Sequence, residues 1–267
     1  MSLRLEGVGY RYAGSATDAL IDVDLAIEPG EVVGVCGPNA GGKSTLCLVA
    51  GGLAPLTIGG QLRGRVSIDG SATAGAKQYE VAQRVGILFQ EPQAQLSDSV
   101  PTVWEEVAFG PRNLSLPLDE VVARTWGALE ALDIADLCER DPGRLSGGQA
   151  QLVALASVLA LQPAYLVLDE PTSQLDPEGT RLVAEALARA AAVTGAGILV
   201  VEHKTDLLAR LCARLAIVEA GRIVKQGTAV TMLGLPELDE LGVSPPETVR
   251  LRRAVEATGG HWDPSWT

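Results

Sequence analysis

The sequence predicts an α/β fold in which helices cover both faces of a central, mainly parallel sheet. Short apolar runs recur along the 267-residue chain, at 32–36, 85–89, 165–168, 198–201 and 215–218. Turn residues or helical patterns bound each run, and strands buried on both faces have this continuous apolar character. A glycine-rich loop follows the first run and leads into an apolar helix from Lys43 to about Ala50.

The flanking segments follow other patterns. Residues 3–28 alternate and contain Gly and Asp turns, which predicts short antiparallel strands, including one at 19–27. Between about 91 and 146, the spacing of Val122, Trp126 and Leu129 predicts a helical insertion between two core strands. Beyond 228 we expect a tail of short helices, the last capped by Ser244 and ended by Gly259. The domains are therefore expected at 1–228 and 229–267.

Charge and hydropathy exclude some functions. The formal net charge is −12, whereas proteins that bind nucleic acid generally present a basic face to the phosphates, so we expect no nucleic-acid partner. No apolar run approaches the roughly 20 residues of a membrane-spanning helix. Any role at a membrane must therefore depend on a partner.

The glycine-rich loop predicts phosphate binding. Small residues let backbone N–H groups approach phosphate oxygens, and the following helix adds its positive end. Lys43 supplies a charge for the β- and γ-phosphates, and the hydroxyl of Ser44 is a ligand for Mg²⁺. We expect a helical φ at Ala40, since a positive φ would strain it. The residues expected to hold the nucleotide here are Gly37, Pro38, Asn39, Ala40, Gly41, Gly42, Lys43, Ser44 and Thr45.

Two carboxylates end the apolar run that begins at Tyr165. Neighbouring side chains on a strand point in opposite directions, so Asp169 and Glu170 can serve different purposes. Asp169 is expected to hold Mg²⁺ through water, as in other phosphate-loop enzymes. Glu170 is expected to polarise the attacking water.

Two more polar residues follow predicted strands. His203 comes after the run at 197–202, and ligands bind at this end of the strands in open α/β sheets, so it is a candidate contact to the γ-phosphate. Gln90 ends the run at 85–89, where its amide would meet both the metal ion and the attacking water. Either residue alone would be weak evidence.

The pentapeptide Leu145–Gln149 (LSGGQ) predicts a second anion site. Ser146 is a natural helix cap, and Gly147 and Gly148 leave first-turn N–H groups open. The chain then has two anion sites, the glycine-rich loop and LSGGQ, for one nucleotide. This makes sense if each chain uses its LSGGQ segment to complete the nucleotide site of its neighbour. Ser146, Gly147, Gly148 and Gln149 are therefore expected to contact the ATP held by another chain.

With these motifs in this order, residues 3–227 resemble an ATP-binding cassette (ABC) ATPase. The resemblance implies a P-loop NTPase (RecA-like) core with an N-terminal antiparallel β subdomain, an inserted α-helical subdomain and a short helical tail. It also implies that Tyr12 stacks on adenine. Residues Ser173–Asp176, called the coupling loop below, would link two sites across a dimer, with Asp176 near the nucleotide.

Three segments resemble the ATPase subunits of energy-coupling factor (ECF) transporters: residues 85–95, 102–113 and 241–251. The resemblance implies a homo- or heterodimer of ATPase subunits at the cytoplasmic face of the cell membrane. The expected partners are an integral membrane scaffold and a membrane substrate-binding subunit, and the expected cargo is a vitamin or a transition-metal ion. The acidic residues near the scaffold are expected to dock its basic residues: Glu91, Asp98, Glu105 and Glu106.

Some features depart from the family pattern. Ala40-Gly41 stand where Gly-Ser is usual, Leu152 replaces a frequent Arg, and Gln174 replaces a small residue of the coupling loop. The family often continues past residue 267, so we expect a fragment of a longer or fused protein. Alternative functions are the ATPase of another ABC transporter class, a weakly hydrolysing partner in a heterodimer, and a soluble ABC ATPase acting on nucleic acid. The charge and the single cassette disfavour the last.

Overall fold

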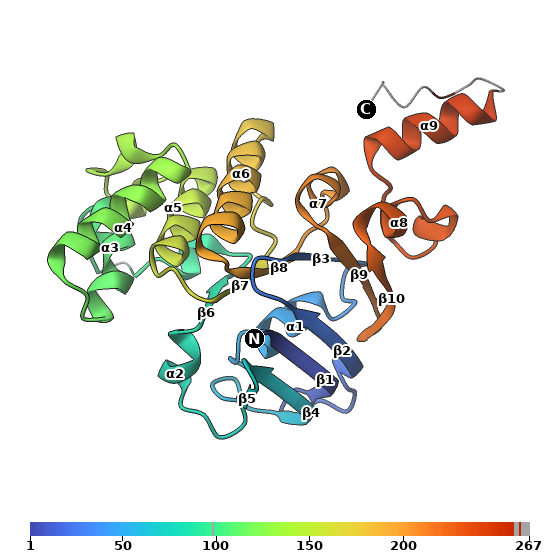
Figure 1. Cartoon of the computed structure of the whole chain (residues 1–267), viewed down its shortest axis with the longest axis horizontal. Helices are drawn as coiled ribbons and strands as arrows, with labels where there is room; N and C mark the ends of the chain where they lie inside the picture. Colours follow the sequence, from blue (N-terminus) through green and yellow to red (C-terminus); the bar gives the residue numbers. More distant parts are fainter. Residues whose placement is uncertain (98, 259–261, 263–267) are drawn as a thin grey trace.

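The computed structural model describes residues 1–97, 99–258 and 262. A six-stranded sheet crosses the centre of the molecule (Figure 1). Its strand order is β10-β9-β3-β8-β7-β6, and only the edge strand β10 runs antiparallel to its neighbour. The strands are β3 (Val32–Cys36), β6 (Val85–Leu88), β7 (Tyr165–Asp169), β8 (Gly197–Val201), β9 (Arg214–Glu219) and β10 (Arg222–Thr228). The apolar runs are thus strands of one sheet, as predicted.

A second, antiparallel sheet lies on one side of the first, with α1 (Lys43–Ala50) between them (Figure 1). Its order is β2-β1-β4-β5. The strands are β1 (Leu3–Arg11), β2 (Leu20–Ile27), β4 (Gln61–Ile68) and β5 (Ser71–Ala72). Both faces of α1 are therefore covered, which explains why six of its eight residues are buried.

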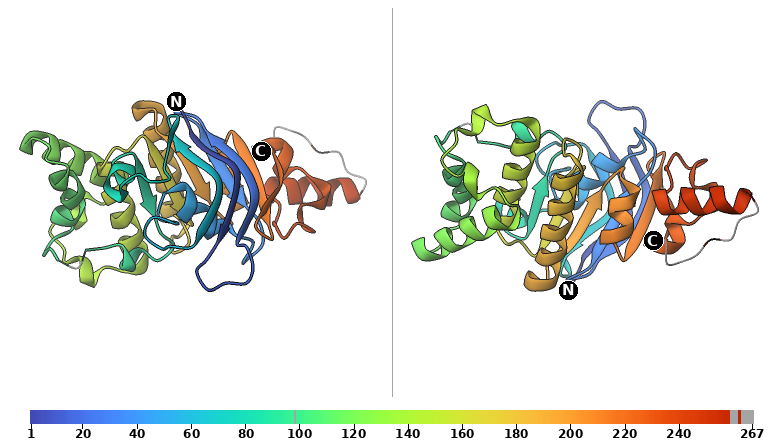
Figure 2. Two further views of the ribbon diagram at one scale, coloured as in Figure 1. Left: turned by 90° about the horizontal axis from the view of Figure 1, so that it is seen from below. Right: turned by 90° about the horizontal axis from the view of Figure 1, so that it is seen from above.

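Helices cover the other face of the central sheet. Between β6 and β7 the chain forms α3 (Val103–Asn113) and α4 (Leu118–Ala131), which pack on α5 (Gly147–Ala160). These helices and the C-terminal tail lie at opposite ends of the molecule in both views of Figure 2. The remaining helices are α2 (Gln78–Ala82), α6 (Pro177–Thr194), α7 (Thr205–Leu211), α8 (Ala229–Leu233) and α9 (Glu247–Ala257), with 3₁₀ turns at 92–94, 135–137, 142–144 and 236–238.

The central sheet separates two hydrophobic cores. Within β7, Leu166 and Leu168 pack with the helices, while Tyr165 and Val167 pack with α1 and the antiparallel sheet. Alternate side chains point to opposite faces, so a strand between two cores must be apolar at every position. This arrangement accounts for the uninterrupted apolar runs.

The spacing of Val122, Trp126 and Leu129 predicted a helix, and these residues do lie on α4, in an insertion between β6 and β7. Leu129 is buried, while Trp126 is 37% exposed. One local prediction is wrong. The last helix begins at Glu247 with Pro246 as its cap, so Ser244 lies before it and makes no cap. Gly259 lies outside the described residues.

The tail and the surface add two observations. α9 has no buried residue, and Leu251 on it is 50% exposed. No helix in the described part of the chain combines the length and apolar character that crossing a lipid bilayer requires. The domain limits at 228 and 229 stay predictions.

Candidate nucleotide-binding site

The glycine-rich loop lies between β3 and α1, in close contact with the β9–β10 hairpin. At Gly37 φ is 146°, and a Cβ there would lie 2.0 Å from the carbonyl oxygen of Val218. The N–H of Gly221 donates to the oxygen of Gly41 at 2.8 Å, and the N–H of Ile21 donates to the oxygen of Gly221 at 2.7 Å. The β9–β10 hairpin therefore holds the loop, and β2 in turn holds the hairpin.

Ala40 corrects a prediction. Its φ is 58°, in the left-handed region, where a helical value was expected. The loop turns sharply between Pro38 and Gly41, whose N–H donates to the oxygen of Pro38 at 3.2 Å, and this turn requires the left-handed conformation. Such a conformation costs a residue with a Cβ about 1–2 kcal/mol, so the fold stores a small strain here.

Lys43 folds back over its own loop. The buried Nζ donates to the carbonyl oxygens of Gly37 at 3.0 Å and Pro38 at 2.8 Å. Burial lowers the pKa of Lys43, while the carboxylates of Glu170 and Asp169 oppose this change. The ammonium is thus held in the mouth of the loop, where phosphate oxygens would replace the two carbonyls as acceptors.

Asp169 ends β7 beside the start of α1. Its side chain is buried, and its Oδ1 has no hydrogen-bond partner. Burial raises the pKa of Asp169, while a hydrogen bond from the hydroxyl of Ser44 acts in the opposite direction. A buried, unpartnered carboxylate oxygen beside a hydroxyl is a donor set that fits Mg²⁺, which prefers oxygen ligands and retains several waters.

Glu170 lies where three strands end, and its own φ is 50°. Its Oε1 is 3.1 Å from Nε2 of His203, and its Oε2 accepts from Nε2 of Gln90 at 2.9 Å. These partners follow β8 and β6, the two neighbours of β7. The structure therefore brings together the three residues expected to contact the attacking water, the metal ion or the γ-phosphate.

A cavity of about 710 Å³ lies beside the phosphate loop and Glu170, and its lining does not include His203 or Asp169. It is lined by the phosphate loop, Gln90 and Glu170, and by residues that sequence reasoning missed: Thr17, Asp18, Ala19, Ala220 and Gly221. The last two form the turn of the β9–β10 hairpin, both with positive φ. The Ala-Gly pair indicates a turn in the sequence, but nothing local indicates that this turn lies against the loop.

Tyr12 lies beside this cavity. Its hydroxyl is 3.0 Å from Oγ1 of Thr45, and its ring meets that of Tyr10 edge to face at 4.9 Å between centroids. Tyr12 is thus held near the start of α1. Its stacking on adenine stays a prediction.

The LSGGQ segment starts α5 as expected. Oγ of Ser146 accepts from the N–H of Gln149 at 3.3 Å, and Oε1 of Gln149 accepts from the N–H of Ser146 at 3.1 Å. Gln174 of the coupling loop covers Gly147, where a Cβ would lie 2.1 Å from its Oε1. Asp176 caps α6 by accepting from the N–H of Gly179 at 2.8 Å. Among the described residues, the cavity lining includes neither Asp176 nor the glycines of LSGGQ.

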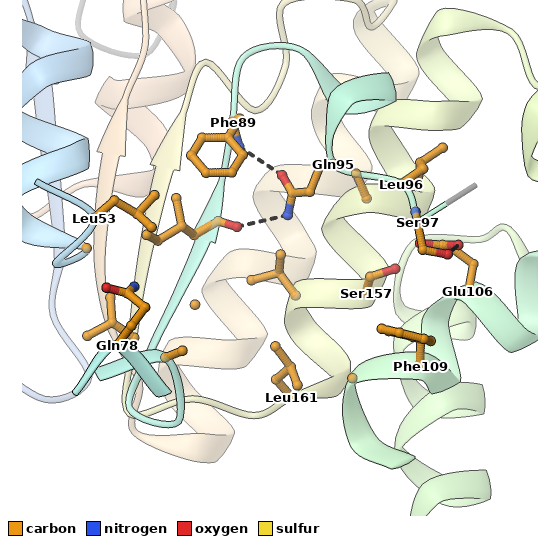
Figure 3. Close-up of a pocket in the computed structure, with 18 residues that line it drawn as sticks. Leu53, Gln78, Phe89, Gln95, Leu96, Ser97, Glu106, Phe109, Ser157 and Leu161 are labelled. Atoms are coloured by element: carbon orange, nitrogen blue, oxygen red, sulfur yellow. Dashed lines mark hydrogen bonds between the residues drawn. The ribbon is translucent and has the colours of Figure 1, made fainter. Parts of the chain in front are cut away.

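A second cavity, of about 350 Å³, lies between β6, α3 and α5 (Figure 3). Gln95 forms one wall, accepting from the N–H of Phe89 at 3.0 Å and donating to the oxygen of Ile87 at 2.9 Å. Phe109 on α3 is 45% exposed at the other side. The cavity is thus an apolar hollow next to the segment that carries Gln90.

Glu106 corrects another prediction. It was expected to dock a basic partner residue, but it is only 5% exposed. Its carboxylate accepts from the N–H and the hydroxyl of Ser97, at 2.8 and 2.6 Å. The buried carboxylate therefore holds the wall of the second cavity from inside. Glu91 is exposed and Glu105 is half-buried, while Asp98 lies outside the described residues.

The family model described as ABC transporter matches residues 20–173, more than half of the chain. The chain belongs to the ABC transporter family. The energy-coupling factor transporter ATP-binding protein EcfA2 of Symbiobacterium thermophilum is 40% identical over 97% of this chain and 90% of its own length. With the P-loop NTPase fold, this relationship identifies the chain as an ABC-family ATPase.

Two solved structures share this fold. The cbiO1 protein of Clostridium perfringens, part of the ABC transporter complex cbiONQ, has a TM-score of 0.78 and 30% identity, covering 96% of this chain and 98% of its own. A dimeric ATP-binding cassette in a post-hydrolysis state, bound to ADP and Pi, has a TM-score of 0.75 and 26% identity, covering 86% and 99%. The ABC cassette fold therefore accounts for nearly the whole chain.

Proposed function

We propose that this ABC ATPase energises an ECF-type membrane importer of a vitamin or a transition-metal ion. The observation that carries the proposal is the contact of Glu170 with both His203 and Gln90 beside the phosphate loop. The names of two relatives, an energy-coupling factor ATPase and a subunit of cbiONQ, support the transporter class.

In this proposal the chain acts by positioning and electrostatics. Lys43 holds the β- and γ-phosphates, and Tyr12 stacks on the base. Ser44, Asp169 and Gln90 would hold Mg²⁺, which neutralises phosphate charge when bound. Glu170 orients and polarises the attacking water, and His203 holds the γ-phosphate while contacting Glu170.

A second ATPase subunit completes each site in this proposal. The LSGGQ segment is a capped helix start that lies outside the cavity of its own chain, so its open N–H groups suit a nucleotide bound to another chain. The tail helix α9 leaves apolar residues such as Leu251 exposed, which suits a contact between the C-terminal segments of two subunits.

The membrane scaffold binds at the second cavity in this proposal, at the cytoplasmic face of the membrane. The cavity adjoins the segment that carries Gln90. A partner helix bound there would therefore contact this segment and move when Gln90 moves. Glu91 and Glu105 remain as docking groups for basic residues of the scaffold, whereas the buried Glu106 cannot serve as one. Reversing the charges of Glu91 and Glu105 should weaken binding, and most strongly at low salt.

The test is the rate of ATP hydrolysis per molecule as the purified chain is diluted, compared with Glu170→Gln. We expect the wild-type rate to fall on dilution, because dimers dissociate, and the variant to hydrolyse at least about 100-fold more slowly. A rate per molecule that dilution leaves unchanged would contradict the shared site. Equally slow wild type and variant would contradict the catalytic role of Glu170 and favour a weakly hydrolysing partner subunit.

A further inference from the structure

Glu202 is a buried carboxylate that the proposed function does not use. It directly precedes His203 and is 2% exposed. Its Oε2 accepts from the hydroxyl of Thr172 at 2.6 Å, and its Oε1 accepts from the N–H groups of His203 at 2.8 Å and Lys204 at 3.2 Å. A buried charge is costly unless hydrogen bonds satisfy it, so these three donors hold the turn at His203 in one conformation.

Lys204 makes the complementary contact from the other side of His203. Its Nζ donates to the carbonyl oxygens of Thr172 at 2.8 Å and Leu175 at 3.2 Å, and to Oγ1 of Thr180 at 3.0 Å. An ammonium group has three N–H donors, and all three are used here. The lysine thus binds the coupling loop and the first turn of α6.

The coupling loop is therefore attached at two points. Leu175 and the preceding Thr172 bind the residues that flank His203, while Gln174 lies against Gly147 at the start of α5. His203 itself contacts Glu170 at 3.1 Å. One loop thus connects the LSGGQ segment to the residue that contacts Glu170.

We propose that Glu202 and Lys204 are positioning residues that make the location of His203 depend on the coupling loop. The inference rests on the proposed function, in which a second subunit closes over the site. A subunit that presses on the loop moves Thr172 and Leu175, and the two flanking side chains carry that movement to His203. Hydrolysis then requires the closed arrangement, while binding of ATP to one chain does not.

The experiment compares Lys204→Met with Arg210→Met. Each change removes one cation, from the cap of α7 or from its last turn, but Arg210 is exposed and, within the described residues, makes no hydrogen bond or ion pair with the loop. We expect Lys204→Met to lower kcat for ATP at least tenfold and to leave the Kd of a fluorescent ATP analogue within twofold. Arg210→Met should change neither. Thr172→Val removes only the hydroxyl that is bound to Glu202. This variant should also lower kcat, and it should lower thermal stability less than Lys204→Met does.

The double variant His203→Ala/Lys204→Met distinguishes positioning from general stability. Since Lys204 acts through His203, kcat should equal that of His203→Ala within twofold. A further tenfold loss in the double variant, or a kcat for Lys204→Met within twofold of Arg210→Met, overturns the inference and leaves the proposed function intact. A wild-type chain whose hydrolysis is the same as that of Glu170→Gln overturns both.

Discussion

The phosphate loop and the LSGGQ segment both lie at the start of a helix and were both predicted to bind anions, but the chain builds them differently. The β9–β10 hairpin holds the loop through a backbone contact, β2 in turn holds the hairpin, and the loop opens into a cavity of about 710 Å³. The LSGGQ segment is fixed mainly by its own cap between Ser146 and Gln149, and Gln174 touches it from the coupling loop. The phosphate loop thus lines a cavity of its own chain, and the LSGGQ segment does not line that cavity.

This difference bears on where each predicted site would bind its ligand. Lys43 donates to two carbonyls of its own loop, so a nucleotide would need only to replace these two hydrogen bonds. At LSGGQ the side chains of Ser146 and Gln149 already bind each other's backbone N–H groups, and Gly147 and Gly148 do not line the cavity at the phosphate loop. This asymmetry is why we propose that the second site works only against another subunit.

Lys43→Ala tests the enclosed site and should have the largest effect. Charged hydrogen bonds contribute about 1.5–3 kcal/mol each, and Lys43 would make more than one to phosphate. Affinity for ATP and the rate of hydrolysis should both fall at least about 100-fold. A fluorescent ATP analogue and a phosphate-release assay measure the two quantities. Retained affinity would show that the loop does not hold the nucleotide.

Gln149→Glu tests the open site. A Glu at this position keeps the helix cap, because Ser-x-x-Glu forms the same reciprocal hydrogen bonds, so stability should not fall. The added negative charge would repel the phosphate of a neighbouring nucleotide and slow hydrolysis by about 10- to 100-fold. Affinity of the single chain for ATP should stay unchanged. Gln151→Glu is no substitute control, since Gln151 is buried. Glu130→Gln on α4 changes the charge by one unit of the opposite sign, away from the site, and should leave hydrolysis unchanged.

Asp169→Asn tests whether the buried, unpartnered carboxylate of this site lowers the stability of the chain. The wild-type carboxylate is buried with an unpartnered oxygen, so the neutral amide should raise the free energy of unfolding of the nucleotide-free chain by about 1 kcal/mol at pH 7. Hydrolysis should be lost at the same time. Thermal unfolding without Mg²⁺-ATP measures the stability of the nucleotide-free chain, and thermal unfolding with Mg²⁺-ATP measures the stabilisation that the nucleotide adds.

The pH dependence of that difference has a definite sign. Folding raises the pKa of Asp169 above its ordinary value of 3.8, chiefly through burial. The stability that this group contributes to the wild type is therefore present below pH 3.8, and it is lost as the pH rises through the raised pKa. The advantage of Asp169→Asn should be largest at neutral pH and vanish under acid conditions. An advantage that grows as pH falls would contradict this account.

Ala40→Gly tests the local strain of the loop and should have the smallest effect. Relief of the left-handed conformation is worth about 1–2 kcal/mol, and the greater chain entropy of glycine offsets about 0.5–1 kcal/mol of it. We expect a net stabilisation of about 0.5 kcal/mol, measured by denaturant unfolding. Ala50→Gly, inside α1, is the matched control and should destabilise the chain instead.

Much of the architecture was predictable because it depends on local patterns. The β3, β6, β7, β8 and β9 strands follow apolar runs that only a doubly covered sheet requires, and the start of α5 follows the Ser146 cap. The residues after these strands were candidates because parallel strands carry their ligands at one edge. Glu170, His203 and Gln90 do meet there.

Other features depend on segments that are distant in sequence. The left-handed Ala40 follows from the sharp turn of the loop against Val218 and Gly221, and the burial of Glu106 depends on Ser97 folding over it. The wall formed by Thr17–Ala19 and the hairpin turn is likewise a long-range contact.

Motif spacing and burial periodicity are properties of neighbouring residues, so the chemical groups and the strand ends that carry them could be read from the sequence. Which of those groups touch, and which line a cavity, depends on how distant segments pack. Packing joins Glu202 to Thr172 and Lys204 to Leu175 of the coupling loop, and it leaves LSGGQ outside the cavity, because hydrogen-bond partners more than twenty residues apart are chosen by packing.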